Sequence, residues 1–441
     1  MDTIDDRGYS FTKYKYCYGV AMLSVEQALE RVLSCVDALE GEERPILDSL
    51  GQVLAEDVYA GINVPSLDNS VMDGYAVQSR DTEGANRESP RILRVVGTVA
   101  AGSKADCRVV SGTAVRIMTG APIPEGADSV VRFEDTNETC RKEDNDGIGI
   151  LKGVKAGNFI RRAGEDIAKG SKSLGAGKVI RPSEVGVLAS LGYDKVKVIR
   201  RPKVTILATG DELVDIGQPL PPGRIYNSNS YGIAASVLSY GGVPEVLGIA
   251  LDNETSLLGR LQQRLDTDIM VTSAGVSAGD YDMVKDVLAK KGEIVFDTVR
   301  MKPGKPLAFG TIESLDKDGV ARKIPHLGLP GNPVSCMVTG ELFLRPAILK
   351  MLGRKNLARP TVEAVMENAK DNPTRTRVFN RAIVSKRDGR YYARLTGPQG
   401  TGILTSMSKA NGLAIIPEDK EKVEKGDVLQ VMMFGWDDDA F

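Results

Sequence analysis

The chain has 441 residues, 42% of them hydrophobic, and its 57 basic and 59 acidic side chains leave a net charge of -2. It is too long for one ordinary domain, and its balanced charge excludes a global field that would hold nucleic acid or an acidic membrane surface. The first residues are acidic where a secretory signal needs positive charge, so we expect no such signal. No apolar run of about 18 residues occurs, so we expect no membrane span. Five scattered cysteines without a CxxC pair indicate a cytoplasmic protein with free thiols.

The chain begins with a segment that shows no periodicity and then gives a strong helical signal. Residues 1–20 are rich in tyrosine and polar side chains, and we expect a flexible tail. The stretch "SVEQALERVLSCVDAL" at 24–39 repeats apolar residues at helical spacing, with Ser24 and Gln27 placed as a capping box. It predicts an amphipathic helix.

The next 150 residues predict a β domain inserted into a helical one. Short alternating stretches separated by Gly, Asn and Asp fill residues 56–154 and indicate a small antiparallel β domain. The stretch "RPSEVGVLASLG" then returns to helix, with Ser183 as its expected cap and Gly192 as its stop. The expected helical linking domain therefore comprises 21–55 and 155–195.

The second half predicts an α/β domain followed by a β barrel. Within 196–353 three apolar runs each precede a Gly-containing polar loop, and helices are expected at 281–291 and 333–352. This rhythm indicates a parallel sheet, in which ligands bind beyond the carboxyl ends of the strands. Five short strands with charged turns in 354–441 predict the C-terminal barrel domain.

The loops of the α/β domain carry the side chains expected at an anion site. Glycines let backbone N–H groups approach phosphate, hydroxyls add hydrogen bonds, and carboxylates hold hard cations such as Mg²⁺. For one loop alone, a plain turn explains the pattern as well. The polar residues of the three loops are Thr209, Asp211, Glu212, Ser273, Ser277, Asp280, Asp282, Gly331, Asn332 and Ser335.

Two lysines on a stiffened loop point to the same chemistry. In "VRMKPGKPLAFG", Lys302 and Lys305 each precede a proline, and Gly304 between them permits a sharp turn. The arrangement favours an anion site over the alternative of a solvated hairpin turn. The single histidine, His326, lies beside an apolar strand, which favours a packing role and excludes zinc sites and catalytic relays built on several histidines.

Three polar clusters of the first 170 residues allow either a site or an ordinary turn. "VPSLDNSVMDGYAV" gathers Asp68 and Asp73, and "RIMTGAPIPEGAD" places Thr119 on a Gly-Pro turn, which Asx-type turns explain equally well. "IRRAGEDI" joins arginines to Glu165 and Asp166, and an exposed salt-bridge cluster is its alternative.

Seven motifs together resemble the MoeA-type molybdopterin molybdenumtransferases, the family of the gephyrin E domain, over residues 22–436. That resemblance implies a homodimeric subunit with a helical domain, an inserted β domain, a MogA-like α/β domain that binds molybdopterin and a C-terminal β barrel. The implied reaction inserts molybdenum from molybdate into adenylylated molybdopterin and releases AMP. The motifs, in family order, are "DNSVMDGYAV", "RIMTGAPIPEGAD", "IRRAGEDI", "LATGDEL", "GVSAGDYD", "MKPGKPLAFG" and "LPGNPVS".

The resemblance also implies roles for individual residues. The implied catalytic residues are Asp68, Thr119, Asp166, Glu212 and Asp282. Asp252 and Asp282 match acidic positions that would hold Mg²⁺. The implied substrate-binding residues are Thr209, Gly210, Asp211, Gly275, Ser277, Asp280, Lys302, Lys305, Pro330, Gly331, Asn332, Pro333, Ser335, Arg381 and Thr401, with Ser406 as the alternative to Thr401.

The chain departs from the family pattern at two positions, and two other functions stay open. Ala274 stands where the family commonly has glycine, and Thr298 stands where many members have a lysine. Arg300, two residues further along an expected strand, should lie on the same face as Thr298 and could supply the missing charge. The α/β domain alone resembles molybdopterin adenylyltransferases, and a non-catalytic scaffold like gephyrin is the third hypothesis. Expected partners are a second copy that shares the active site, an adenylyltransferase and apo-molybdoenzymes. Molybdate and tungstate, both tetrahedral dianions, fit equally well.

Overall fold

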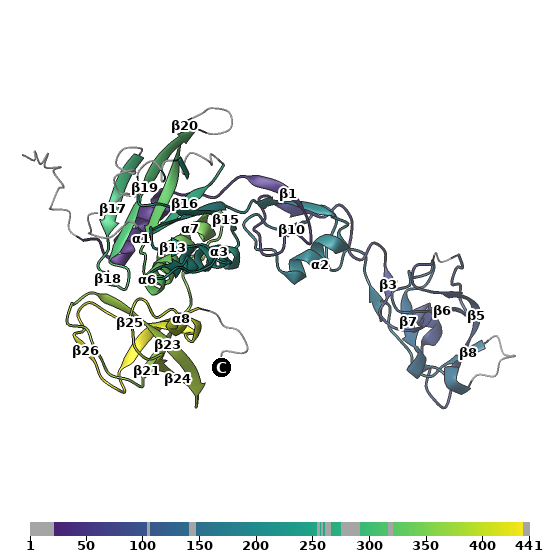
Figure 1. Ribbon diagram of the computed structural model, residues 1–441. Helices are drawn as coiled ribbons and strands as arrows, with labels where there is room; N and C mark the ends of the chain where they lie inside the picture. The colour runs from purple at the N-terminus through teal and green to yellow at the C-terminus, as the bar shows by residue number, and fades with distance from the viewer. Residues whose placement is uncertain are drawn as a thin grey trace, which may run out of the picture. The chain divides into compact units, whose positions relative to one another are not determined.

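Two units make up the structure, a computed structural model of the chain (Figure 1). Unit 1 lies within Met1–Gly41 and Ile199–Phe441, and unit 2 is Glu42–Val198. The residues that the structure describes are 22–103, 106–140, 147–253, 256, 259–260, 266–274, 292–315 and 321–434.

A six-stranded mixed sheet organises unit 1. Its first four strands are parallel, and the last two run antiparallel to their neighbours. The expected parallel sheet is therefore correct for four strands only. Along the chain only residues 316–320 separate β19 from β20, and a parallel pair would need a longer connection. In spatial order the strands are β15 (Val243–Ala250), β12 (Lys203–Thr209), β16 (Ile269–Ser273), β20 (Ala321–Leu329), β19 (Pro306–Leu315) and β17 (Gly292–Thr298).

Helices pack on one face of this sheet in a shared apolar core. α3 (Ser228–Tyr240) lies there beside α6 (Pro333–Thr339), a π-helical turn η4 (Gly340–Leu344) and α7 (Arg345–Met351). These three follow without a break, which confirms the helix expected at 333–352. The π turn precedes Pro346, which has no N–H for the regular ladder. The helix expected at 281–291 lies outside the described residues.

Helix α1 (Val25–Ser34) belongs to unit 1, although the sequence grouped it with residues 155–195. Ser24 accepts a hydrogen bond from the Gln27 N–H and Gln27 closes the capping box, as expected. Ala28 and Val32 are fully buried in the core that contains α7. The apolar face of the helix packs into this core, and that packing decides the domain to which the helix belongs. The local sequence shows that the face is apolar but not which core it joins.

The C-terminal part of unit 1 is a closed five-stranded barrel, as predicted. β25 pairs with both β27 and β23, which closes the barrel, and the short β18 (Met301–Lys302) adds alongside β23. The barrel strands in order are β23 (Arg377–Arg387), β24 (Arg390–Leu395), β21 (Thr361–Met366), β27 (Val428–Met433) and β25 (Gly412–Ile416). Smaller elements of unit 1 are β13 (Leu213–Val214), β14 (Ile225–Tyr226), β22 (Lys370–Asp371), α8 (Thr405–Ser408) and β26 (Lys422–Val423).

Unit 2 is built on a five-stranded sheet with an apolar cluster on each face. All pairs are antiparallel except β5 with β6, so the expected antiparallel domain is in fact mixed. The stretch between these two strands, residues 100–112, is long enough to bring the chain back to the same end of the sheet. The strands in order are β7 (Ser129–Arg132), β4 (Gly74–Val77), β6 (Thr113–Ile117), β5 (Arg91–Val99) and β8 (Gly147–Ile150).

Short strand pairs and one helix complete unit 2. Helix α2 (Pro182–Ser190) ends at Gly192 as expected, but Ser183 is not its cap, because Pro182 already occupies the first turn. The carboxylate of Glu184 accepts the free Arg181 N–H at 3.0 Å instead. The pairs are β1 (Gly41–Pro45) with β11 (Lys195–Ile199), β2 (Val58–Tyr59) with β10 (Lys172–Leu174), and β3 (Asn69–Ser70) with β9 (Ile160–Arg161). Three 3-10 turns are η1 (Ser79–Thr82), η2 (Phe133–Asp135) and η3 (Glu138–Cys140).

His326 is a core residue of the mixed sheet. Its side chain is 1% exposed, and one ring nitrogen lies 3.1 Å from the Thr272 hydroxyl on the neighbouring strand. Burial lowers the pKa of His326 to about 3, so the ring is neutral at physiological pH. This environment agrees with the packing role expected from the sequence.

Within the described part of the chain, no helix is long and apolar enough to cross a membrane. Cys35 and Cys107, both half-buried, and the buried Cys336 are free thiols. These thiols agree with the expectation from cysteine spacing.

Candidate active site

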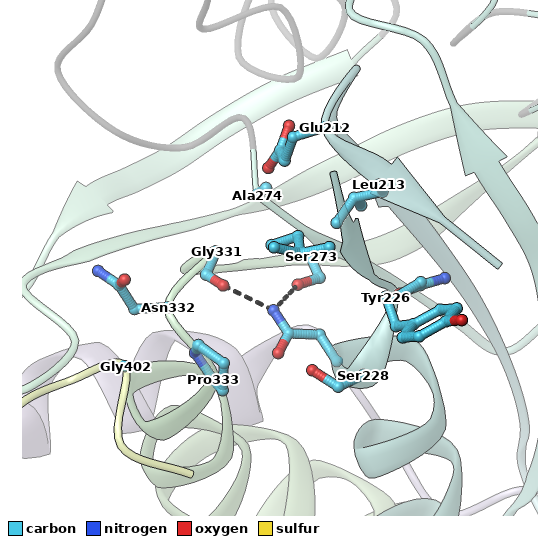
Figure 2. Close-up of a pocket in the computed structure, with 13 residues that line it drawn as sticks. Glu212, Leu213, Tyr226, Ser228, Ser273, Ala274, Gly331, Asn332, Pro333 and Gly402 are labelled. Carbon is cyan, nitrogen blue, oxygen red and sulfur yellow. Dashed lines mark hydrogen bonds between the residues drawn. The ribbon is translucent and has the colours of Figure 1, made fainter. Parts of the chain in front are cut away.

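A cavity of about 530 Å³ lies beyond the carboxyl end of β16, where ligands bind in open α/β sheets. Its walls come from the end of β16, the loop that leads into α6, the start of α3 and one barrel loop. In Figure 2 Asn332 and Gly402 lie toward one end of the cavity, and Tyr226 lies toward the other. The lining residues are Glu212, Leu213, Ile225, Tyr226, Asn227, Ser228, Asn229, Ser273, Ala274, Gly331, Asn332, Pro333 and Gly402.

Only part of this lining was predictable from the sequence. Glu212, Ser273 and the loop Gly331–Pro333 were predicted, whereas the start of α3 was missed. The signal for that wall is "YNSNS" at 226–230, a cluster of capping residues before an apolar helical run. Asn227 is indeed the cap, since its side chain accepts the Ser230 N–H at 3.2 Å.

The amino end of α6 is already occupied by a barrel loop. Pro333 has no N–H, and the Val334 N–H donates to the Thr401 carbonyl at 3.0 Å. The expected anion site at this helix end therefore has fewer free backbone N–H groups than the sequence indicated. Ser335, one residue further on, is 4% exposed.

Two carboxylates meet at the ends of β12 and β15. The Asp211 N–H lies 3.3 Å from a carboxylate oxygen of Asp252, and the Asp252 N–H lies 3.2 Å from a carboxylate oxygen of Asp211. No group of three or more potential metal ligands occurs among the residues that the structure describes. A pair of carboxylates still fits Mg²⁺, which uses one or two carboxylates and keeps water or substrate oxygens as its other ligands.

The two predicted lysines lie on the loop between β17 and β19 of the mixed sheet, and β18 within this loop pairs with β23 of the barrel. Lys302 is in β18, and Gly304 has φ +101°, so the sharp turn expected here is present. Both Lys302 and Lys305 are exposed, and neither forms an ion pair with another described residue. They are not among the residues that line the cavity. Arg300 is exposed between the buried Val299 and Met301, but it lies beyond β17, which ends at the half-buried Thr298, so a face shared with Thr298 stays a prediction.

Arg381 is a buried residue of the barrel in this structure. It is 1% exposed and donates from Nε to the Ser406 hydroxyl at 3.0 Å and from a terminal nitrogen to the Gly400 carbonyl at 2.9 Å. Burial lowers the pKa of its guanidinium. Arg381 therefore holds the loop that carries Thr401 and Gly402, and it does not face the cavity itself.

In unit 2 three motifs that are distant in sequence come together. Backbone bonds join Ser70 to Ala121 and Val71 to Phe159, so the stretches around Asp68, Thr119 and Arg161 are neighbours. One carboxylate oxygen of Asp73 accepts the Thr119 N–H at 2.7 Å and its hydroxyl at 3.0 Å. These hydrogen bonds lower the pKa of Asp73.

Asp68 is held in a comparable way. Its carboxylate accepts the Ala163 N–H at 2.8 Å and pairs with Arg162 at 2.6 Å, and these two contacts lower its pKa. Asp166 lines a separate hollow of about 450 Å³ together with Arg161. The salt-bridge alternative for "IRRAGEDI" is thus partly realised through Arg162.

The remaining predicted residues take two kinds of position. Thr209 is buried at the end of β12, Gly210 follows it at φ +148°, and Pro330 is buried after β20. Four lie outside the described residues: Gly275, Ser277, Asp280 and Asp282.

Comparison with known proteins gives the family. Three family models match in order: "MoeA N-terminal region (domain I and II)" at 23–192, "Probable molybdopterin binding domain" at 205–350 and "MoeA C-terminal region (domain IV)" at 364–434. Molybdopterin molybdenumtransferase 2 of Mycobacterium tuberculosis is 36% identical over 94% of this chain and 100% of its own length. The chain belongs to the MoeA family.

Other MoeA relatives match over most of the chain. The molybdopterin molybdenumtransferase of Bacillus subtilis is 34% identical over 93% of this chain and 94% of its own length. A solved molybdopterin biosynthesis MoeA protein from Pyrococcus horikosii superposes with a TM-score of 0.78 at 33% identity, covering 94% of this chain and 100% of the solved one. The mixed sheet, the inserted β domain and the barrel are thus the MoeA fold.

One departure from the MoeA pattern has a visible structural consequence. Ala274, which stands where the family commonly has glycine, adopts φ +77° at the cavity wall. A Cβ atom in this left-handed region is unfavourable. A Cβ added to Gly331 would also lie only 3.1 Å from the Cβ of Ala274. The two loops therefore approach each other closely at this wall.

Proposed function

We propose that this protein is a molybdopterin molybdenumtransferase that inserts molybdenum from molybdate into adenylylated molybdopterin and releases AMP. The observation that carries the proposal is the position of the cavity. Twelve of its thirteen lining residues fall in the segment that matches the molybdopterin-binding model, and Gly402 falls in the C-terminal one. Identity of 36% to a molybdopterin molybdenumtransferase over nearly the whole chain supports the same activity.

The cavity suits an extended ligand with a planar ring and phosphates. Its volume of about 530 Å³ lies within the usual range for small-molecule sites. Ile225 and Tyr226 give one wall an apolar and aromatic surface on which a flat ring can pack. Ser228 and Asn332 supply polar groups for the other parts of the ligand.

Charged residues elsewhere in unit 1 fit the remaining requirements of the reaction. Mg²⁺ held by Asp211 and Asp252, with Asp282 as a further candidate, would neutralise charge on the phosphoric anhydride. Lys302 and Lys305, which have no anionic partner among the described residues, are available to bind molybdate.

The proposal includes the assembly and the setting of the enzyme. Asp68, Thr119 and Asp166 of one subunit would act with unit 1 of the partner subunit in a homodimer. The adenylylated substrate would come from a molybdopterin adenylyltransferase, and the product would pass to apo-molybdoenzymes in the cytoplasm. Free thiols at Cys35 and Cys336 support a reducing compartment.

AMP release by the purified protein tests the proposed reaction. Adenylylated molybdopterin should yield AMP only when molybdate and Mg²⁺ are both present, because charge on the anhydride must be neutralised for cleavage. Chromatographic quantification of AMP, with Mg²⁺ removed by a chelator in a parallel sample, measures this dependence. Combined Lys302→Ala and Lys305→Ala substitution should reduce the rate and raise the molybdate concentration needed for half-maximal release.

Two other results would point elsewhere. Transfer of AMP from ATP to molybdopterin, without any need for molybdate, would assign the protein to the adenylyltransferases. A stoichiometric protein partner recovered together with absent AMP release would favour a scaffold.

A further inference from the structure

Asn229, on the first turn of α3, links two walls of the cavity. Its side-chain nitrogen donates to the Ser273 hydroxyl at 2.8 Å and to the Gly331 carbonyl at 2.7 Å. Both bonds appear in Figure 2, where they converge between the labelled Ser273 and Gly331. The two acceptors belong to different elements, the end of β16 and the loop that enters α6.

This link lies where the sheet stops holding those elements together. The β16 and β20 ladder ends at Ser273 and Leu329, and the Ala274 N–H makes one more bond to Leu329 at 3.1 Å. Among the described residues, the Asn229 amide bonds to both segments just beyond the ladder. The two segments lie close together there, since a Cβ added at Gly331 would be 3.1 Å from the Ala274 Cβ.

The chemistry of the site favours asparagine over similar side chains. A primary amide has two N–H bonds that diverge from one nitrogen, and both are used here. The Gly331 carbonyl only accepts hydrogen bonds, whereas the Ser273 hydroxyl can accept or donate. An ionised aspartate of the same shape would therefore lose both donated bonds and place an oxygen against the Gly331 oxygen, and only the Ser273 hydroxyl could donate to it.

We propose that Asn229 is a positioning residue of the active site, which fixes the distance between the Ser273 and Gly331 walls at the value that the ligand requires. This inference rests on the proposed function, in which the cavity binds adenylylated molybdopterin. Asn229 acts through the two walls, and its loss changes the shape of the cavity before it changes any reacting group.

The test compares Asn229→Asp, Asn229→Ala and the control Ser239→Ala, which removes a hydroxyl on the same helix away from the cavity. AMP release from adenylylated molybdopterin is measured at saturating molybdate between pH 5 and 8. Loss of both hydrogen bonds should raise KM about tenfold with a smaller change in kcat, because binding is impaired before chemistry. The control variant should match the unaltered protein.

The pH profile separates positioning from general damage to the fold. Because it faces the Gly331 carbonyl oxygen, the introduced carboxyl of Asn229→Asp should have a pKa above the ordinary aspartate value, so that it gains a proton as the pH falls toward about 5 and can donate one hydrogen bond again. Its KM should then approach the normal value, whereas Asn229→Ala, which has no titratable group, should show a constant defect. Equal KM for all variants, or the same pH profile for both substitutions, overturns the inference.

Hydrogen exchange gives an outcome that does not depend on activity. The Ala274 N–H, which lies beside the linked walls, should exchange several-fold faster in Asn229→Ala than in the unaltered protein and in Ser239→Ala. Unchanged exchange would refute the positioning role even if no AMP is released. Absent AMP release by the unaltered protein, with faster exchange in the variant, would instead refute the proposed function alone.

Discussion

At the scale of single residues, Ala274 has a strained backbone at the cavity wall, at the position expected to depart from the family pattern. Glycine would adopt φ +77° without strain, whereas the Cβ of alanine is crowded in that region. The sequence pattern identified the departure, but only the backbone angle shows its consequence. The close Gly331 loop adds a second constraint on the same side chain.

Ala274→Gly should stabilise unit 1 by about 0.5 to 1 kcal/mol, since relief of left-handed strain exceeds the greater entropy of glycine in the unfolded chain. Calorimetric unfolding measures the change. Ala235→Gly, in the interior of α3 and exposed, is the matched control and should destabilise by about 1 kcal/mol. A loss of stability in Ala274→Gly would contradict the strain argument.

Gly331→Ala should lower the free energy of unfolding by less in the Ala274→Gly background than in the unaltered protein, because the Cβ that it meets is gone.

At the scale of elements, most local signals were correct, apart from the cap of α2, and several long-range pairings were not predicted. The cap of α1 and the glycine stop of α2 depend on a few neighbouring residues, so their sequence signals were correct. The parallel β5 and β6 pair, the antiparallel β19 and the packing of α1 in unit 1 depend on distant partners. Sequence patterns do not contain that information.

The candidate site shows the same division. Glycines and prolines around Gly331 marked its loop, because turn chemistry is local. Asn229 was missed because its pattern resembles an ordinary helix cap, and only the folded chain shows its two acceptors. The burial of Arg381 is likewise a tertiary property, since the barrel closes around it.

The loop that carries Lys302 and Lys305 depends on the absence of a side chain at Gly304. A Cβ at this position would lie 2.4 Å from the Cγ2 of the fully buried Thr339, and φ is +101°. Gly304→Ala should therefore destabilise unit 1 by about 2 kcal/mol or more and reduce molybdate-dependent AMP release. Denaturation and AMP assays measure the two effects.

Thr339→Ser is the matched partner for this test. It removes the methyl group that would clash and keeps the hydroxyl, which bonds to the Ser335 and Cys336 carbonyls at 2.8 and 3.0 Å. The double variant should lose less stability than the sum of the two single losses, because the clash is removed while the backbone strain stays. Strict additivity would show that contact with Thr339 does not fix the loop.

At the scale of the whole molecule, the proposed homodimer makes a prediction that separates the two units. If each active site takes Lys302 and Lys305 from one subunit and Asp68 from the partner subunit, substitutions in different units are complementary. The Lys302→Ala, Lys305→Ala protein and the Asp68→Asn protein should each be nearly inactive alone.

After subunit exchange, about half of the dimers are mixed, and each mixed dimer has one intact site of two. About a quarter of normal AMP release should therefore return. Mixing the lysine variant with Asn229→Asp, both altered in unit 1, should release no more AMP than the Asn229→Asp chains release alone, because no combination of these chains has an intact unit 1. Absence of complementation between the lysine variant and Asp68→Asn, with exchange verified by mass, would mean that each site lies within a single chain.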